Sequence, residues 1–313
     1  MHSRVKLKKQ KKRSWKKWIL IFGLILLFIS GGCIYYVWDK VSSTIETMHN
    51  PLVRDKDPER QKELNKILKN TKSINILLLG VDARAGDRGR SDTMILMSLN
   101  PKTDRMIMMS IPRDTYVNIP GRGMDKINHA YAFGGTELSI NTVEEAFNVP
   151  LHFYARVNME GFQQGVDAIG GVNVNNEFEF SQGGKHFPKG EIHLNGDDAL
   201  NYIRMRKKDP RGDMGRNDRQ RQVIAAAMKK GANVSNITKF GEVFDILGNN
   251  VETNMDQDQM QKLFTSYRHT QNNIETLEVK GSGQMMNGVW YYVVPDGEFQ
   301  QLTKTIKDHM EAK

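Results

Sequence analysis

Arginines are concentrated in one segment of the chain, with six of them among the eighteen residues 204–221. The planar guanidinium group binds two phosphate oxygens at once, which the ammonium group of lysine does not. A predicted helix over 216–231 places Arg216, Arg219 and Gln220 on one face of its first turn. Cations are unfavourable at a helix N-terminus, which favours an anionic ligand there. A phosphate site, a basic surface patch paired to nearby aspartates and a nucleic-acid contact all stay open on this segment alone.

Two aspartates form a second candidate group. Asp82 lies shortly after one apolar run, and Asp92 lies directly before the next apolar run. The loop between the two aspartates carries three arginines. Mg²⁺ typically takes one or two protein carboxylates and completes its shell with water and substrate phosphate. The pair therefore predicts a magnesium (or manganese) site. A solvated polar loop with ordinary ion pairs is the alternative interpretation.

Short apolar runs predict the strands that position these charges. They are Ile74–Leu79, Thr93–Leu99 and Met106–Ile111. A turn cluster at 100–104 makes the second and third runs an antiparallel pair. If the first and second runs also form a hairpin, Asp82, Asp92 and Arg113 emerge at one edge of a sheet.

Three further elements are expected outside these runs. Residues 57–69 predict a short solvated helix, and 276–280 predicts a strand. The apolar and aromatic run 289–294 is expected to close the sheet or to form one of its edges.

The net charge of +9 is confined to the N-terminus. Residues 1–17 contain nine Lys and Arg and no acid, and subtracting these nine from the 45 of the chain leaves 36, equal to the 36 Asp and Glu. The rest of the chain is therefore not a generally basic nucleic-acid binder, and no nucleic acid is expected as a partner.

A run of 21 uncharged residues, 18–38, follows this basic tail. At about 1.5 Å per residue, a helix of that length crosses a hydrocarbon core of roughly 30 Å. Aromatic residues lie near both of its ends, and the basic flank predicts a cytoplasmic tail with the body facing outward, as in a single-pass type II protein. A cleaved signal peptide, whose apolar core is about 7–15 residues, and a lipoprotein processing site at Cys33 are the alternatives.

Several other chemistries are excluded by the residues present. Cys33, the single cysteine, lies within the apolar run, so the body has no disulfide, thiol nucleophile or cysteine-based metal site. No P-loop, His-Glu-x-x-His pair or Gly-x-Ser-x-Gly elbow occurs in the sequence.

Five ordered motifs over roughly residues 73–232 resemble those of the LytR–CpsA–Psr family, in particular its wall-teichoic-acid-ligating members. They are Asp82-Ala83-Arg84, Arg90-Ser91-Asp92-Thr93, Ser110-Ile111-Pro112-Arg113-Asp114, Asp125-Lys126-Ile127-Asn128-His129-Ala130-Tyr131 and the arginine segment, which Leu194-Asn195-Gly196-Asp197-Asp198-Ala199-Leu200 precedes. The resemblance implies a three-layer α/β/α domain with a central mixed sheet, preceded by one transmembrane helix. It implies a long apolar cavity for a polyprenyl tail, and an arginine-lined mouth that holds pyrophosphate with Mg²⁺ or Mn²⁺.

The same resemblance assigns roles to residues. It makes Asp82 and Asp92 the metal-associated carboxylates, and Asp82 and Arg113 catalytic. The implied pyrophosphate-binding set is Arg84, Arg90, Arg113, Lys126, Arg204, Arg206, Arg216, Arg219 and Gln220. The general base is left open between Asp82 and Asp114.

The implied activity is transfer of an anionic glycopolymer, with wall teichoic acid the first candidate, from an undecaprenyl-pyrophosphate-linked donor to a muramic acid hydroxyl of peptidoglycan, with release of polyprenyl phosphate. A membrane-bound polyprenyl-pyrophosphate binder or pyrophosphatase, and a cell-envelope transcriptional regulator, are the alternatives. The expected organisation is a cytoplasmic tail (1–17), a signal-anchor helix in the cell membrane (18–38), an extracellular stalk (39–72) and an extracellular catalytic domain (73–313).

Overall fold

The computed structural model describes residues 39–82, 89–231, 246 and 248–313. The chain divides into two units between Ser43 and Thr44, and the second, Thr44–Lys313, is a compact unit that contains every element described below. The predicted tail (1–17) and membrane anchor (18–38) lie outside the described residues, as does Arg84. Among the described residues, no helix has both the length and the apolar character needed to cross a bilayer.

The second unit is built on a six-stranded mixed sheet with the strand order β11-β6-β1-β2-β3-β12. The strands are β1 (Ile74–Val81), β2 (Ser91–Asn100), β3 (Arg105–Ser110), β6 (Phe153–Asn158), β11 (Val251–Thr253) and β12 (Ile274–Glu278). β2 is antiparallel to β1 and to β3, while β6 and β12 pair in parallel with β1 and β3. The three core strands and their two predicted hairpins are thus confirmed. Because β1, β3, β6 and β12 share one direction, their carboxyl ends meet at one edge of the sheet.

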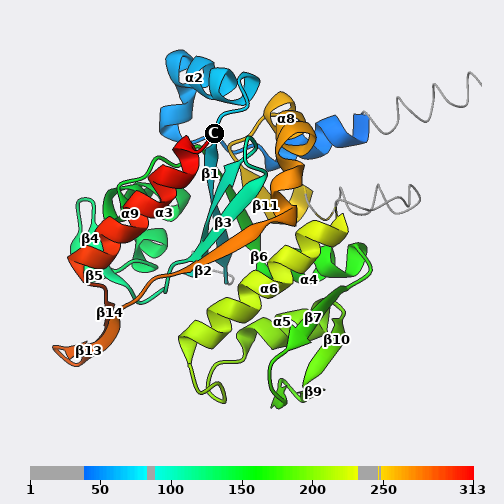
Figure 1. The fold of residues 1–313 in the computed structure, drawn as a ribbon, viewed down its shortest axis with the longest axis vertical. Helices are drawn as coiled ribbons and strands as arrows, with labels where there is room; N and C mark the ends of the chain where they lie inside the picture. The colour runs from blue at the N-terminus through cyan, green and yellow to red at the C-terminus, as the bar shows by residue number, and fades with distance from the viewer. Residues whose placement is uncertain (1–38, 83–88, 232–245, 247) are drawn as a thin grey trace, which may run out of the picture. The chain divides into compact units, whose positions relative to one another are not determined.

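Helices cover both faces of this sheet (Figure 1). One face carries α3 (His129–Phe147) and α9 (Asp296–Glu311), and the other carries α2 (Pro58–Lys69), α6 (Asp213–Gly231) and α8 (Gln257–Tyr267). Alternation along β1 explains the arrangement, since Leu77 and Leu79 pack toward α3 and α9, whereas Ile74 and Ile76 pack toward the other helices. The predicted α/β/α domain with a mixed sheet is confirmed.

A smaller core lies on the far side of α6 from the sheet. Its elements are α4 (Met159–Ala168), β7 (Val172–Asn176), β8 (Phe180–Gln182), β9 (Lys185–Phe187), β10 (Gly190–Leu194) and α5 (Gly196–Arg204). Val223 of α6 belongs to this core, while the adjacent Ile224 packs against the core of the sheet. The helix α6 therefore lies between two packed layers.

Two hairpins lie beside the sheet rather than in it. They are formed by β4 (Tyr116–Ile119) with β5 (Gly123–Lys126), and by β13 (Ser282–Met286) with β14 (Val289–Val293). The expectation that the run 289–294 closes the sheet or forms its edge is wrong. β12 takes that edge position, and the aromatic run pairs with β13 in a hairpin that projects from the body (Figure 1).

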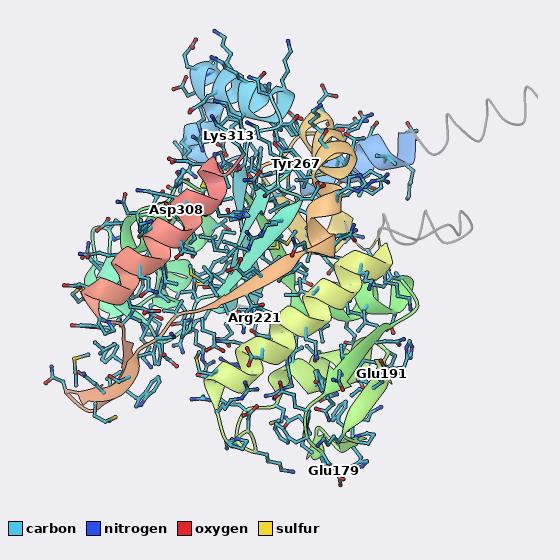
Figure 2. All side chains as sticks on the ribbon, in the orientation of Figure 1. Glu179, Glu191, Arg221, Tyr267, Asp308 and Lys313 are labelled. Carbon is cyan, nitrogen blue, oxygen red and sulfur yellow. The ribbon has the colours of Figure 1, made fainter. Side chains whose placement is uncertain are left out.

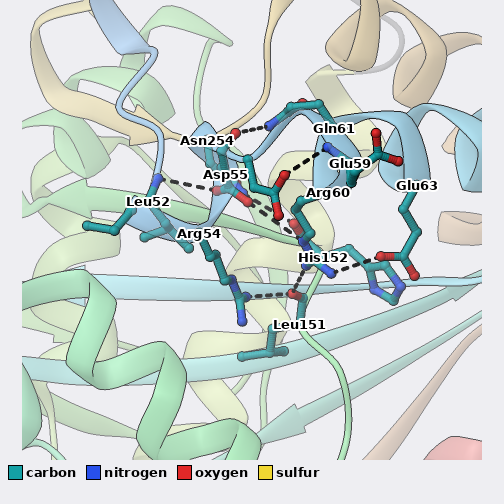
Figure 3. A network of polar contacts seen from close by, with 12 residues as sticks. Leu52, Arg54, Asp55, Glu59, Arg60, Gln61, Glu63, Leu151, His152 and Asn254 are labelled. Atoms are coloured by element: carbon teal, nitrogen blue, oxygen red, sulfur yellow. Dashed lines mark hydrogen bonds and ion pairs between the residues drawn. The ribbon is translucent and has the colours of Figure 1, made fainter.

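The segment expected to be a stalk contains residues that pack into the second unit. Leu64 and Leu68 of α2 are buried against the sheet. In the short helix η1 (Val53–Lys56), the buried Asp55 accepts a hydrogen bond from Asn254 Nδ2 at 2.8 Å, and Arg54 donates to the carbonyl of Leu151 at 2.8 Å (Figure 3). The predicted helix over 57–69 is present, but one side of it is packed rather than solvated. A second short helix, η3 (Arg268–Asn272), precedes β12.

Candidate active site

The pairing of β2 with β3 places Arg113 opposite Asp92. Ile95 pairs with Ser110, and the same register carried past the end of β3 sets Arg113 against Asp92. Arg113 Nη1 donates to Asp92 Oδ1 at 3.0 Å. The sequence prediction that these two residues meet at one edge of the sheet is confirmed in geometry.

Asp82 reaches the same edge from β1. The backbone N–H groups of Asp82 and Asp92 both donate to the carbonyl of Arg90, at 3.4 and 3.1 Å, so the start of β2 ties the two aspartates together. The Asp92 side chain is about one third exposed, with 34% of its surface open to solvent. Two carboxylates at an open edge fit Mg²⁺, which completes its shell with water and phosphate oxygens. Among the described residues no group of three or more metal-ligating side chains is present, so the fit rests on this pair.

Asp114 connects Arg113 to Lys126. The buried Asp114 lies with Oδ2 at 3.6 Å from Arg113 Nε and with Oδ1 at 2.8 Å from Lys126 Nζ. Burial opposes the charge of Arg113, but Asp92 and Asp114 outweigh it and raise the pKa of Arg113 above its usual value. Arg113 is therefore held as a cation in a fixed orientation.

A second ion-pair group comes from the arginine segment. Asp213, the first residue of α6, has Oδ1 at 2.8 Å from Arg206 Nε and at 3.2 Å from Arg216 Nη2. The carboxylate at the first turn suits the positive end of the helix dipole and offsets the unfavourable Arg216. One acidic side chain thus orients two of the predicted phosphate-binding arginines.

The two groups meet at the same edge. Burial is the largest cause that lowers the pKa of Arg216, and the positive charges of Arg113 and Arg206 lower it further against the opposing pull of Asp213 and Asp92. Neither Arg113 Nε nor Arg216 Nε has a hydrogen-bond partner among the described residues. We call Arg113, Lys126, Arg206 and Arg216 the cationic cluster. Arg113 and Arg206 act unfavourably on the charge of Arg216, and Asp213 and Asp92 act against them.

Arg219 makes its contacts in the small core. Its Nη1 donates to Asp209 Oδ2 at 2.6 Å, its Nη2 donates to the carbonyl of Met205 at 2.6 Å, and its guanidinium lies over the rings of Phe180 and Tyr202. These partners account for its burial without an anionic ligand. The structure therefore does not bring Arg219 to the cationic cluster.

The remaining predicted site residues lie as follows. Gln220 is buried on α6, four residues after Arg216. Arg204 is exposed at the end of α5, and Arg90 is exposed beside the two aspartates. Arg221, which was not in the predicted set, pairs with Asp218 and lies on α6 beside β12 (Figure 2).

Asp213 is the residue that sequence reasoning missed. In the sequence it is only one of the nearby aspartates that could pair with a basic surface patch, because an aspartate among arginines carries no signal of its own. Its spacing of three residues before Arg216, just ahead of the helix predicted over 216–231, is the available clue.

The sequence matches the LytR_cpsA_psr family model over residues 35–308, which is most of the chain. The chain belongs to the LytR–CpsA–Psr family. Among its relatives is the polyisoprenyl-teichoic acid–peptidoglycan teichoic acid transferase TagU of Oceanobacillus iheyensis, which is 57% identical over 99% of both chains. The protein of the same name from Bacillus subtilis is 47% identical, over 97% of this chain and 98% of its own. The predicted family resemblance and the predicted transferase class are confirmed by these LytR–CpsA–Psr relatives.

Solved structures of the family have the same fold. The crystal structure of B. subtilis TagU is similar with a TM-score of 0.63 and 47% identity, and covers 77% of this chain and 98% of its own. A structure described as TagT bound to LI-WTA is similar with a TM-score of 0.66 and 31% identity, over 77% of this chain and 92% of its own. An Enterococcus faecalis protein described as a transcriptional regulator is similar with a TM-score of 0.71 and 32% identity, over 79% of this chain and 90% of its own.

Proposed function

We propose that this chain transfers an anionic glycopolymer, wall teichoic acid first among the candidates, from an undecaprenyl-pyrophosphate-linked donor to a muramic acid hydroxyl of peptidoglycan. The names of the O. iheyensis and B. subtilis relatives support teichoic acid and peptidoglycan as the two substrates. The structure described as TagT bound to LI-WTA supports a wall teichoic acid as the donor part.

The cationic cluster is the observation that carries the proposal. The buried guanidinium group of Arg216 lies close enough to the half-buried Arg113, and to Arg206, for their positive charges to lower its pKa. Asp213 and Asp92 do not fully offset burial and these positive charges at Arg216, whose pKa stays lowered, and an anionic ligand would offset the rest. A pyrophosphate group, with several oxygens available to the planar guanidinium forks, is the ligand that this geometry suits best.

The chemistry proposed for the cluster is a phosphoryl transfer. The muramic acid oxygen forms a bond to the phosphorus that bears the glycopolymer, and the bond from that phosphorus to the bridging oxygen breaks. The electron pair stays on the departing polyprenyl phosphate, and the hydroxyl proton leaves with a base or with water. Arg113, Arg206 and Arg216 act by stabilising the negative charge that grows on the phosphate oxygens as the bridge breaks.

Asp82 and Asp92 are proposed to hold Mg²⁺ or Mn²⁺, which when bound adds a further positive charge for the phosphate oxygens. Asp92 also positions Arg113 through their 3.0 Å hydrogen bond. Asp114 has one oxygen beside Lys126 and the other beside Arg113, so its role in this proposal is to orient those cations. The general base stays unassigned between Asp82 and Asp114, because a carboxylate that holds a metal ion is a poor base.

The proposal includes the cellular location. The basic tail (1–17) and apolar run (18–38) support a signal anchor in the cell membrane, with the second unit on the outer side, where peptidoglycan lies. A role as a transcriptional regulator, the description attached to the E. faecalis structure, has less support. Outside the first 17 residues basic and acidic side chains are equal in number, and an outward-facing domain has no access to DNA.

The decisive experiment incubates the purified full chain with a radiolabelled, lipid-linked glycopolymer and peptidoglycan in the presence of Mg²⁺. Labelled polymer covalently attached to peptidoglycan is the expected product. Free phosphate without attachment would instead indicate a pyrophosphatase, and retention of intact donor would indicate a binder. Either of those two results contradicts the proposed transfer.

A further inference from the structure

The hairpin β13–β14 has an uncharged surface with several exposed apolar side chains. No charged residue occurs from 281 to 294, although 26% of all residues are charged. Met285 is 65% exposed, and Val289 and Trp290 are also exposed. Exposed apolar side chains that gather in one place, rather than scatter singly, mark an interaction surface.

Two neighbouring side chains extend the same surface. Met124 of β5 and Phe133 of α3 are exposed, and Tyr116 of β4 packs edge-on against Tyr291 of β14 with ring centroids 4.8 Å apart. Of the seven large hydrophobic side chains that are exposed in the described part of the chain, five belong to this group. We call it the apolar rim, and its members are Met124, Phe133, Met285, Val289 and Trp290.

The shape of the hairpin is set by its turn and by one close contact. Its turn, Asn287-Gly288, has positive φ at both positions (50° and 79°), as a tight two-residue hairpin turn requires. The indole of Trp290 lies against the backbone of Gly283, where a Cβ would come within 2.8 Å of the ring. The apolar rim is therefore held out from the body in a defined shape (Figure 1).

The apolar rim is continuous with the cationic cluster. The backbone N–H of Tyr292 donates to the carbonyl of Asp114 at 2.8 Å, and Lys126 lies over the ring of Tyr291. The side chain of Asp114 in turn pairs with Arg113. On the other side, the exposed Arg122 lies over the ring of Phe133, which adds a cation to the rim.

We infer that the apolar rim is a membrane-contact surface, which dips into the headgroup region of an anionic bilayer beside the cationic cluster. Tryptophan and tyrosine favour the membrane–water interface, methionine and valine favour the acyl region, and nearby Arg122 and Lys126 are attracted to anionic headgroups. The inference rests on the proposed function, since a donor whose lipid tail stays in the bilayer must present its pyrophosphate at the membrane surface. Contact at the rim brings the cluster to that depth.

A fragment of residues 44–313 provides the test. It is a compact unit with its own hydrophobic cores. The crystal structure of B. subtilis TagU covers a similar share, with 98% of its own chain aligned to 77% of this one. The four tryptophans of the full chain are at 15, 18, 38 and 290, so Trp290 is the only tryptophan of the fragment. Its fluorescence emission reports directly on the apolar rim.

The fragment is titrated with phosphatidylglycerol vesicles, with neutral phosphatidylcholine vesicles and with soluble muropeptide glycan fragments. We expect a blue shift of Trp290 emission and measurable partitioning with the anionic vesicles, and weaker partitioning with the neutral ones. The double variant Met285→Gln with Val289→Thr should partition about tenfold less, because the two side chains lose their apolar burial in the bilayer. The matched control, Phe264→Gln with Val53→Thr, removes two exposed apolar side chains from elsewhere and should partition as the unmodified fragment does.

Three outcomes overturn the inference. They are no response to either kind of vesicle, an equal loss of partitioning in the control variant, and a blue shift with glycan fragments in place of vesicles, which would assign the rim to the acceptor. Neither the lipid-linked donor nor peptidoglycan takes part in the vesicle measurement. Failure of the transfer assay therefore leaves the vesicle result standing, and failure of vesicle binding leaves the transfer result standing.

Discussion

Arg113 lies opposite Asp92 across strands β2 and β3, and donates from Nη1 to the Asp92 carboxylate at 3.0 Å while Asp114 lies 3.6 Å from its Nε. A guanidinium held from two sides does not need to reorient when a phosphate binds. Preorganised donors of this kind stabilise charge in a transition state at little further cost in reorganisation. The strand register, rather than a flexible loop, thus sets the position of the group that we propose to be catalytic.

Arg113→Ala should reduce kcat for glycopolymer transfer by about 10²–10³-fold, the usual loss when one such donor is removed. Arg113→Lys should recover part of the activity, because it keeps the charge but loses the planar fork. The transfer assay with labelled donor measures both variants. Arg105→Ala is the matched control, since Arg105 begins the same strand but is exposed and pairs with Glu275. Equal activity of the Arg113 and Arg105 variants would refute the assignment.

Asp213→Asn should make stability more dependent on a bound anion. The change removes the carboxylate between Arg206 and Arg216, so the repulsion within the cationic cluster is less offset in the free protein. We expect a lower Tm without ligand and a larger rise in Tm on addition of inorganic pyrophosphate than in the wild type. Thermal unfolding followed by circular dichroism over a pyrophosphate series measures this.

The control for that experiment is Asp218→Asn. Asp218 lies on the same helix and also pairs with two arginines, Arg211 and Arg221, neither of which is in the cationic cluster. Its variant should lose some stability, but its response to pyrophosphate should match the wild type. A larger pyrophosphate response in the Asp218 variant than in the Asp213 variant would show that the anion binds elsewhere on α6.

The sequence predicted the sheet edge well because hairpins and strand periodicity are local properties. Three apolar runs and one turn cluster were enough to bring Asp82, Asp92 and Arg113 to a common edge, and the pairings of β1, β2 and β3 agree. The prediction that residues 289–294 join the sheet is wrong for a related reason. An apolar run shows that a strand forms, but not which partner it takes, and β12 occupies the edge instead.

Long-range packing decided which arginines face the candidate site. Arg216 and Arg219 are three residues apart on one helix and look alike in sequence. In the structure Arg216 lies at the sheet edge, whereas Arg219 lies in the small core, where it contacts Asp209, Phe180 and Tyr202. Only the position of α6 between the two cores separates their roles, and no pattern within the segment encodes that position.

Gly215→Ala should destabilise the start of α6. A Cβ at this position would lie 1.8 Å from Asp209 Oδ2, and Asp209 is buried and fixed by Arg219. Overpacking of this kind typically costs about 1–3 kcal/mol. Urea unfolding should show that loss. Gly231→Ala, on the same helix and with no atom of the described residues within 4 Å of its added Cβ, should be neutral or slightly stabilising. A Gly215 variant as stable as the Gly231 variant would mean that Asp209 moves freely.

His152 should make the folded state sensitive to acid. Its ring is buried near the charged groups of Arg60 and Arg54, two residues that Figure 3 labels with it. Its Nδ1 accepts a hydrogen bond from the backbone N–H of Asn75 at 3.0 Å. Burial first, and the charges of Arg60 and Arg54 after it, lower the pKa of His152 to about 4 from 6.5. Between these two values the unfolded chain binds a proton at this histidine that the folded chain does not, so stability falls as the pH falls.

The expected loss is about 3 kcal/mol between pH 6.5 and pH 4, since each unit of pKa shift corresponds to about 1.4 kcal/mol. His309, whose pKa burial also lowers, adds a slope of the same sign. Urea unfolding from pH 4 to pH 7 should therefore show a shallower slope in His152→Gln, which keeps an acceptor but takes up no proton, than in the wild type. His193→Gln, on the exposed surface of β10, should keep the wild-type slope. If the His152 and His193 variants have the same slope, the acid sensitivity arises from other groups.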